Sequence, residues 1–162
     1  MEQFTLFYKE FRQKLFYYLM RMTGDYHLSG DIMQESFARL LKHYGPDTPS
    51  ASLLFTIARN AILDHARKKG RDVEMGCEKP DPAQDSEKLL MVRQEYRRVL
   101  AALQRLEEGE REVLALVADN GFSYNQIAQI TGMNAGNVRV KVHRARMKLK
   151  RLLEEGNESW KR

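Results

Sequence analysis

The clearest chemical feature of the chain is a block of positive charge near its C-terminus. Between positions 139 and 151 the sequence has seven Lys or Arg residues and no acidic residue. Such a cluster attracts nucleic-acid phosphates without regard to sequence, and base edges are read by side chains in the first turns of the helix that carries it. A solvated basic helix without a ligand is the alternative interpretation.

The residues around this block predict a helix-turn-helix. Ser123 is a candidate N-cap of a short helix, Gly132 allows a left-handed turn, and a longer helix begins near Ala135. The longer helix has a regular apolar stripe made of Val138, Val142, Ala145, Leu149 and Leu152. Its opposite face carries Gly136, Val140, His143, Arg144 and Met147, flanked by Arg139 and Lys141. One buried face and one cationic face are typical of a major-groove recognition helix, which favours DNA binding over a solvated helix.

A second candidate surface lies on a predicted helix that ends in the basic run 67–71. Its apolar stripe consists of Leu54, Ile57, Ala58, Ala61 and Ile62. The outward face then contains Leu53, Thr56, Asn60, Leu63 and Arg67. An amide beside apolar side chains and a basic tail suits unstacked bases, because the amide can hydrogen-bond a base edge while the cations hold the backbone. Packing of the two leucines against another helix is the alternative.

Enzyme chemistry has little support in the sequence. The histidines at 27, 43, 65 and 143 are scattered, and Cys77 is the only cysteine. There is no His-Glu-x-x-His pair, no glycine-rich phosphate loop and no group placed to activate a nucleophile. Asp64 and His65 are neighbours on a helix and diverge by about 100°, so they cannot form a dyad. We therefore expect no catalytic residue, no metal site and no cofactor.

Three helices are predicted in the first 71 residues. Gly24 ends the first, Ser29 is a candidate N-cap of the second, and Pro46 and Pro49 bound the loop before the third. Apolar residues at steps of three and four support the first two helices, at Phe4, Phe7, Tyr8, Phe11, Leu15, Tyr18, Leu19 and Met22, and at Ile32, Met33, Phe37, Leu40 and Leu41.

The composition changes at residues 72–88, which hold six acidic residues against two lysines together with Pro80 and Pro82. This segment offers too little apolar surface to offset the entropy of ordering it, so it is predicted to be a flexible acidic linker. Helical periodicity resumes at Leu89 and continues to Leu106. The predicted fold is all-α, with two small helical domains at 1–71 and 89–162.

Length and charge agree with this organisation. The chain has 162 residues, 43% of them apolar, and a formal net charge of +5, which suits one compact domain or two small ones with a packed core. No apolar run approaches the roughly 20 residues of a membrane span, and the first residues lack the pattern of a secretory signal. We expect a cytoplasmic protein without membrane insertion.

The whole pattern resembles a sigma factor of the extracytoplasmic-function group of the sigma-70 family. Residues 31–37, Asp-Ile-Met-Gln-Glu-Ser-Phe, are similar to the family's polymerase-binding helix, and residues 54–67 are similar to its promoter-melting helix. Residues 103–114, 122–128 and 138–146 are similar to its C-terminal domain. Residue 53 departs from the pattern, because Leu53 stands where the family usually has tryptophan.

The resemblance implies a role for each candidate residue. Core RNA polymerase would be contacted through its large-subunit coiled-coil clamp by Asp31, Gln34 and Glu35, with the flap as a second polymerase contact. The −10 element, melted to single strands, would be contacted by Leu53, Thr56, Asn60 and Arg67, with Asn60 holding a flipped base. The duplex −35 element would be contacted by Asn134, Asn137, Arg139, Val140, Lys141, His143 and Arg144. An anti-sigma protein is a further partner that the resemblance implies.

Two non-enzymatic alternatives stay open at this level. A helix-turn-helix regulator that binds duplex DNA without polymerase explains the second half equally well, but it does not explain Asn60 on an outward apolar patch or the acidic linker between two different halves. A helical protein that only sequesters another protein explains the aromatic first helix but not the basic helix. Binding to promoter DNA in the presence and absence of core polymerase distinguishes the three classes.

Overall fold

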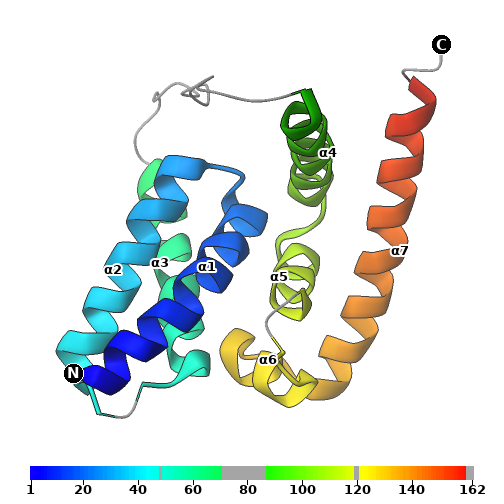
Figure 1. The fold of residues 1–162 in the computed structure, drawn as a ribbon. Coiled ribbons are helices and arrows are strands. Elements are labelled where there is room, and N and C mark those ends of the chain that lie inside the picture. The colour runs from blue at the N-terminus through cyan, green and yellow to red at the C-terminus, as the bar shows by residue number, and fades with distance from the viewer. Residues whose placement is uncertain (48, 71–86, 119–120, 160–162) are drawn as a thin grey trace.

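The computed structural model describes residues 1–47, 49–70, 87–118 and 121–159, and within these ranges it contains helices and no strand (Figure 1). The predicted all-α class is therefore confirmed. The helices are α1 (Glu2–Thr23), α2 (Tyr26–Tyr44), α3 (Ala51–Lys69), α4 (Glu87–Gln104), α5 (Glu108–Val117), α6 (Tyr124–Thr131) and α7 (Ala135–Ser159). Most of the predicted linker lies outside the described residues, and its last two residues form the start of α4.

Helices α1, α2 and α3 pack together as the N-terminal group. Gly24 ends α1 in the left-handed conformation with φ 66°, as the sequence predicted. The predicted cap of α2 was wrong, because Asp25 starts this helix and accepts a hydrogen bond from the Leu28 backbone N–H at 3.0 Å. Ser29 is instead buried inside α2, and its hydroxyl lies 3.0 Å from that of Thr23.

Helices α4 to α7 form the C-terminal group, in which α7 packs against α4, α5 and α6. The sequence did not predict α5 as a separate helix. Arg111 of α5 explains the sharp break after α4, since it donates to the backbone carbonyls of Leu103, Gln104 and Leu106 at 3.1 to 3.3 Å. A half-buried arginine at these carbonyls satisfies acceptors at the end of α4 and complements its dipole.

The two groups pack directly against each other. Helix α1 contacts α4 and α5, and α3 contacts α6. Arg21 donates to the carbonyls of Ala115 at 3.0 Å and Ala118 at 3.1 Å, at the end of α5. In return, Gln104 donates to the carbonyl of Arg21 at 3.1 Å, and Arg111 donates to that of Met22 at 3.2 Å. Backbone acceptors at helix ends on both sides are thus satisfied across the interface.

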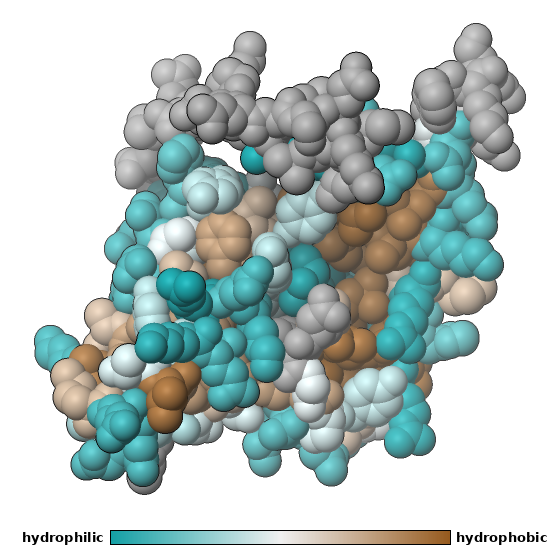
Figure 2. Space-filling model, viewed as in Figure 1, coloured by the Kyte–Doolittle hydropathy of each residue, from teal (hydrophilic) through white to brown (hydrophobic). Residues whose placement is uncertain are grey.

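One continuous core of buried apolar side chains runs through both groups. Figure 2 shows hydrophilic side chains along the outer edge of α7 and apolar ones between α4 and α7. Val99 of α4 and Leu149 and Leu152 of α7 are half-buried and pack against this core. Among the described residues, no helix has both the length and the hydropathy needed to cross a bilayer.

Candidate nucleic-acid interface

The helix-turn-helix has the local geometry that the sequence predicted. Ser123 accepts from the Gln126 backbone N–H at 3.1 Å, and the Gln126 side chain accepts from the Ser123 N–H at 2.9 Å, which forms a complete capping box. Gly132 closes α6 with φ 75°. Asn134 then precedes α7, and its Oδ1 accepts from the Gly136 N–H at 2.8 Å. These contacts fix the direction in which α7 leaves the turn.

Helix α7 buries one face and exposes the other. Val138, Val142 and Ala145 are almost completely buried, as the predicted stripe requires. Of the predicted −35 residues, Lys141 is half-buried and six are exposed: Asn134, Asn137, Arg139, Val140, His143 and Arg144. The exposed face is continuous over the first turns of the helix, which is where a recognition helix contacts base edges.

The side chain of Arg139 is held against α6. Its guanidinium carbon lies 5.9 Å from the centre of the Tyr124 ring, within the range of a cation–π contact. Both residues line a shallow hollow of about 380 Å³ together with Ser123, Asn125 and Gly136. The hollow joins the N-terminal ends of α6 and α7, which carry the positive ends of the helix dipoles. It is therefore a favourable place for an anionic group.

Two other cations of α7 are directed toward α5. Lys148 lies 3.1 Å from Oε1 of the buried Glu110. Lys141 lies so close to Gly109 that a Cβ atom there would be 2.7 Å from its Nζ. The basic block is thus divided between an outward group and a group that pairs with α5.

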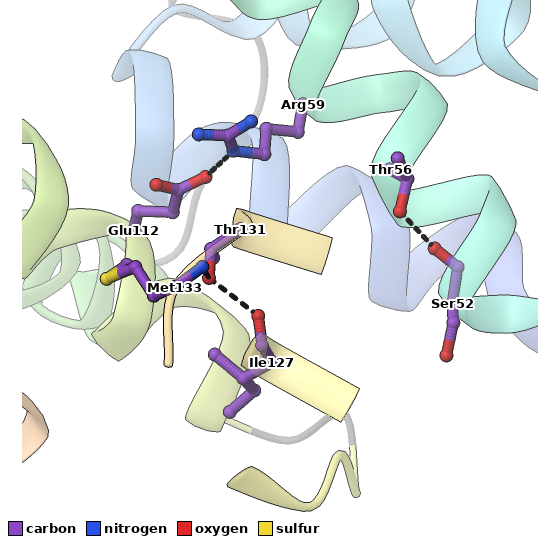
Figure 3. A network of polar contacts seen from close by, with 7 residues as sticks. All are labelled: Ser52, Thr56, Arg59, Glu112, Ile127, Thr131 and Met133. Atoms are coloured by element: carbon purple, nitrogen blue, oxygen red, sulfur yellow. Dashed lines mark hydrogen bonds and ion pairs between the residues drawn. The ribbon is translucent and has the colours of Figure 1, made fainter. Parts of the chain in front are cut away.

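The predicted −10 residues lie on α3 with different exposures. Asn60 and Arg67 are exposed. Thr56 is half-buried, and its hydroxyl donates to the Ser52 carbonyl at 2.7 Å (Figure 3). Leu53 is half-buried and packs against the core, so it is less available than the helical wheel predicted. The exposed part of this surface is therefore the C-terminal half of α3, centred on Asn60.

A second face of α3 is covered by the C-terminal group, which the sequence did not predict. Phe55 is fully buried, and its ring packs edge-on against Phe122 at a centroid distance of 4.9 Å. Arg59 forms an ion pair with Glu112 of α5 (Figure 3). The Glu112 side chain is 7% exposed and that of Arg59 is 25% exposed, so the pair is largely removed from water. The only local sign in the sequence was Phe55, an aromatic residue outside the apolar stripe.

Burial controls the ionisation of this interface. The pKa of the Glu112 carboxyl is raised by burial, which outweighs the opposing effect of Arg59. Tyr18 lies behind the pair, fully buried, and its hydroxyl has no hydrogen-bond partner among the described residues. Burial and the nearby Glu112 both raise the pKa of Tyr18. The region between the two groups is thus a poorly solvated polar layer.

The predicted polymerase-binding residues lie together on α2. Asp31 and Gln34 are exposed, and Glu35 is half-buried. Glu35 forms an ion pair with Arg39 one turn later, and one of its oxygens lies 3.8 Å from Nε2 of His65 on α3. Glu35, Arg39 and His65 line a hollow of about 240 Å³ that continues to Arg67 and Lys68 at the basic end of α3. The α2 surface and the C-terminal half of α3 are therefore adjacent.

Comparison with protein families gives two matches in this chain. The Sigma-70 region 2 model matches residues 7–72 and the Sigma-70 region 4 model matches residues 96–149. Among curated proteins, the ECF RNA polymerase sigma factor EcfG of Rhodopseudomonas palustris is 33% identical over 84% of this chain and 77% of its own length. The RNA polymerase sigma factor CarQ of Myxococcus xanthus is 32% identical over 85% of this chain and 82% of its own length.

Solved structures show the same fold. CnrH, in complex with the cytosolic domain of CnrY, is 25% identical with a TM-score of 0.70, over 94% of this chain and 88% of that chain. The sigma factor RpoE of Bartonella quintana, in complex with the anti-sigma factor NepR, is 22% identical with a TM-score of 0.73, over 95% of this chain and 98% of that chain.

Proposed function

The chain belongs to the extracytoplasmic-function group of sigma-70 family RNA polymerase sigma factors, and we propose which of its residues contact polymerase and which contact each promoter element. As a sigma factor it binds core RNA polymerase and directs it to promoters with −35 and −10 elements. The alternative of a regulator that acts without polymerase is not favoured, because the region 2 match covers the N-terminal helices. The proposal divides the chain into a region 2 domain at 1–71, a linker at 72–88 and a region 4 domain at 89–162.

The −35 element is assigned to α7. Its exposed first turns offer amide, imidazole, guanidinium and apolar groups, and its buried stripe fixes the helix on its domain. We place Asn137, Val140, His143 and Arg144 at base edges, since these side chains are exposed and form no hydrogen bond or ion pair with the other described residues. Arg139 is assigned to the backbone, because its contact with Tyr124 directs it into the hollow beside the helix ends.

The −10 element is assigned to the C-terminal half of α3. Asn60 is exposed between the buried Ala58 and Ala61, and the basic residues near the end of the helix, Arg67, Lys68 and Lys69, are exposed as well. An amide at this position can hydrogen-bond the edge of an extruded base while Arg67 and its neighbours hold the strand. The exposure of Asn60 is the observation that carries this assignment.

Core polymerase is assigned to the α2 surface around Asp31, Gln34 and Glu35. These side chains are adjacent on the helix and reach solvent, and they adjoin the proposed −10 surface through His65. Polymerase bound at α2 would therefore place melted DNA beside α3. The catalysis of RNA synthesis stays with the core enzyme in this scheme, and the place of action is the cytoplasm. The anti-sigma factor in the RpoE complex makes such a protein a candidate partner of this chain too.

The compact arrangement cannot contact both promoter elements at once. Their centres are roughly 25 base pairs apart, or about 85 Å along B-form DNA. Helix α7, with 25 residues, is about 37 Å long, and α3 touches the same helix-turn-helix that leads into it. We therefore infer that the contact between α3 and α6 opens when the chain joins polymerase on a promoter.

The −10 assignment is tested with Asn60→Ala, compared with Gln3→Ala, which removes an exposed amide of α1. Both residues are exposed, so neither change should affect folding or polymerase binding. Asn60→Ala should reduce open-complex formation on duplex promoters, followed by permanganate reactivity of unpaired thymines, and should have much less effect on templates with a pre-opened bubble. Equal melting by Asn60→Ala, Gln3→Ala and the native chain would contradict the assignment.

The polymerase assignment is tested with Glu35→Lys. An exchange of Glu for Lys changes helix propensity very little, so α2 should stay folded while the charge of the surface is reversed. Co-purification with core polymerase should be lost. As a control, Glu10→Lys reverses an exposed charge on α1 and should leave the complex intact. A Glu35→Lys chain that still supports transcription would exclude this surface.

A further inference from the structure

Arg59 occupies an unusual position between the two halves of the protein. It directly precedes Asn60 along α3, and its side chain leaves the helix about 100° away from the face that Asn60 shares with Arg67. Its guanidinium is nevertheless paired with Glu112 of α5, and its side chain is 25% exposed (Figure 3). Glu112 belongs to the C-terminal group, which must leave α3 if both promoter elements are to be bound.

The ion pair is poorly explained as a source of stability. A buried ion pair contributes little net free energy, because the desolvation of both charges offsets their attraction. Here burial still raises the pKa of Glu112 despite its partner, which shows that Arg59 does not fully compensate the desolvation of the carboxylate. If another negatively charged oxygen group replaced the Glu112 carboxylate beside Arg59, the charge of Arg59 would still be balanced.

DNA supplies such an oxyanion beside α3. A guanidinium binds carboxylate and phosphate oxygens with the same fork of N–H donors. When α5 and α6 move away, Arg59 loses Glu112 and stands next to the residue that we assign to the extruded base. A phosphate of the strand that carries this base would be within reach of a side chain that flanks Asn60.

We propose that Arg59 contacts a promoter phosphate next to the base held by Asn60, and that Glu112 occupies Arg59 in the compact form as a competitor of DNA. The proposal rests on the −10 assignment above. It adds a DNA-binding residue to α3, and it gives the interface between the two groups a defined role, because Arg59 cannot serve both oxyanions at once.

The first test measures the salt dependence of holoenzyme binding to a promoter. Each phosphate contact contributes about one unit to the slope of log K against log salt, and a purely structural arginine contributes nothing. Arg59→Gln should lower the slope by about one, whereas Arg59→Lys should restore it. Arg12→Gln, which removes an exposed arginine of α1, is the matched control and should leave the slope unchanged.

Loss of Arg59 alone leaves Glu112 buried without its partner, so the double variant Arg59→Gln/Glu112→Gln provides a form without the unpaired charge. It should show the same reduced slope. An unchanged slope in the double variant would overturn the phosphate contact. Footprinting distinguishes this outcome from failure of the −10 assignment itself. If the native holoenzyme did not protect the −10 element at all, the assignment of α3 to that element would be wrong.

The second test addresses competition by Glu112. Glu112→Gln removes the charge that holds Arg59 but leaves Arg59 itself intact. Its holoenzyme should therefore keep the native salt slope on promoter DNA, while the free chain should bind core polymerase severalfold more tightly because the compact form is less favoured. Affinity for core polymerase equal to that of the native chain would overturn the role of Glu112.

Discussion

Val140 should read a thymine methyl group in the −35 element. It is 49% exposed on α7, while Val138 and Val142 on either side of it are almost completely buried. The neighbouring cations turn away from it, Arg139 toward Tyr124 and Lys141 toward α5. An apolar group is thus left at the centre of the DNA-facing surface, and thymine is the base that presents a methyl group in the major groove.

The expected effect follows from the area of one methyl group. Burial of one methyl contributes about 0.8 kcal/mol, which corresponds to about fourfold in affinity. Replacement of each −35 thymine in turn by deoxyuridine removes only that methyl. At one position, the replacement should weaken binding of the native holoenzyme to the promoter about fourfold in a competition assay. The holoenzyme with Val140→Ala should bind the promoters with thymine and with uracil at that position equally well.

Met147→Ala is the matched control for this prediction. Met147 is 54% exposed on the same face, but it lies seven residues further on, about 10 Å along the helix and past the first turns. It should keep the native response to deoxyuridine. The reasoning would be refuted if the native holoenzyme bound equally well after every replacement of a −35 thymine by deoxyuridine. It would also be refuted if the −35 element had no A·T pair, even if α7 binds that element.

Three further predictions concern stability. Tyr18→Phe should raise the free energy of unfolding by about 1 kcal/mol, measured by urea denaturation, because it removes a buried hydroxyl without a partner; a large loss would reveal a hydrogen bond. Gly132→Ala should cost about 1–2 kcal/mol at φ 75°, although nothing lies within 4 Å of the added Cβ; Gly30→Ala, inside α2 with equally open space, should not destabilise. For Glu112, whose pKa is raised in the folded state, the native form binds the proton more tightly, so stability is lost as pH rises through the folded pKa. The native chain should therefore lose stability more steeply than the Glu112→Gln chain as pH rises above 4.5, measured by urea denaturation at a series of pH values, and an equal pH dependence of the two chains would contradict the burial of this carboxyl.

Local patterns in the sequence were sufficient to predict the helix-turn-helix and every helix except α5, which was not separated from α4. Ser123 and Gly132 act through neighbours three or four residues away, so their roles can be recognised without the fold. The stripe of Val138, Val142 and Ala145 likewise identified the buried face of α7, and hence its exposed face. Ser29 was misassigned because Asp25 offered an equally local cap one turn earlier.

Helical periodicity indicates a buried face only when a helix has one packing partner. Helix α3 has two, because α1 and α2 cover one side and α6 covers another. Phe55 and Arg59 therefore fell outside the predicted stripe, and Leu53 was expected to be more exposed than it is. The same limit applies to Lys148, whose partner Glu110 is 38 residues away.

The sequence by itself therefore determined the helical class, the turn geometry and the exposed residues of α7, since each depends on contacts within a few residues. Only the tertiary structure decided which charges are free. Arg59, Lys141 and Lys148 look alike in the sequence as basic residues on amphipathic helices, yet each meets α5. The pairing of such charges depends on which helices dock, and docking is set by the shape and burial of surfaces far apart along the chain.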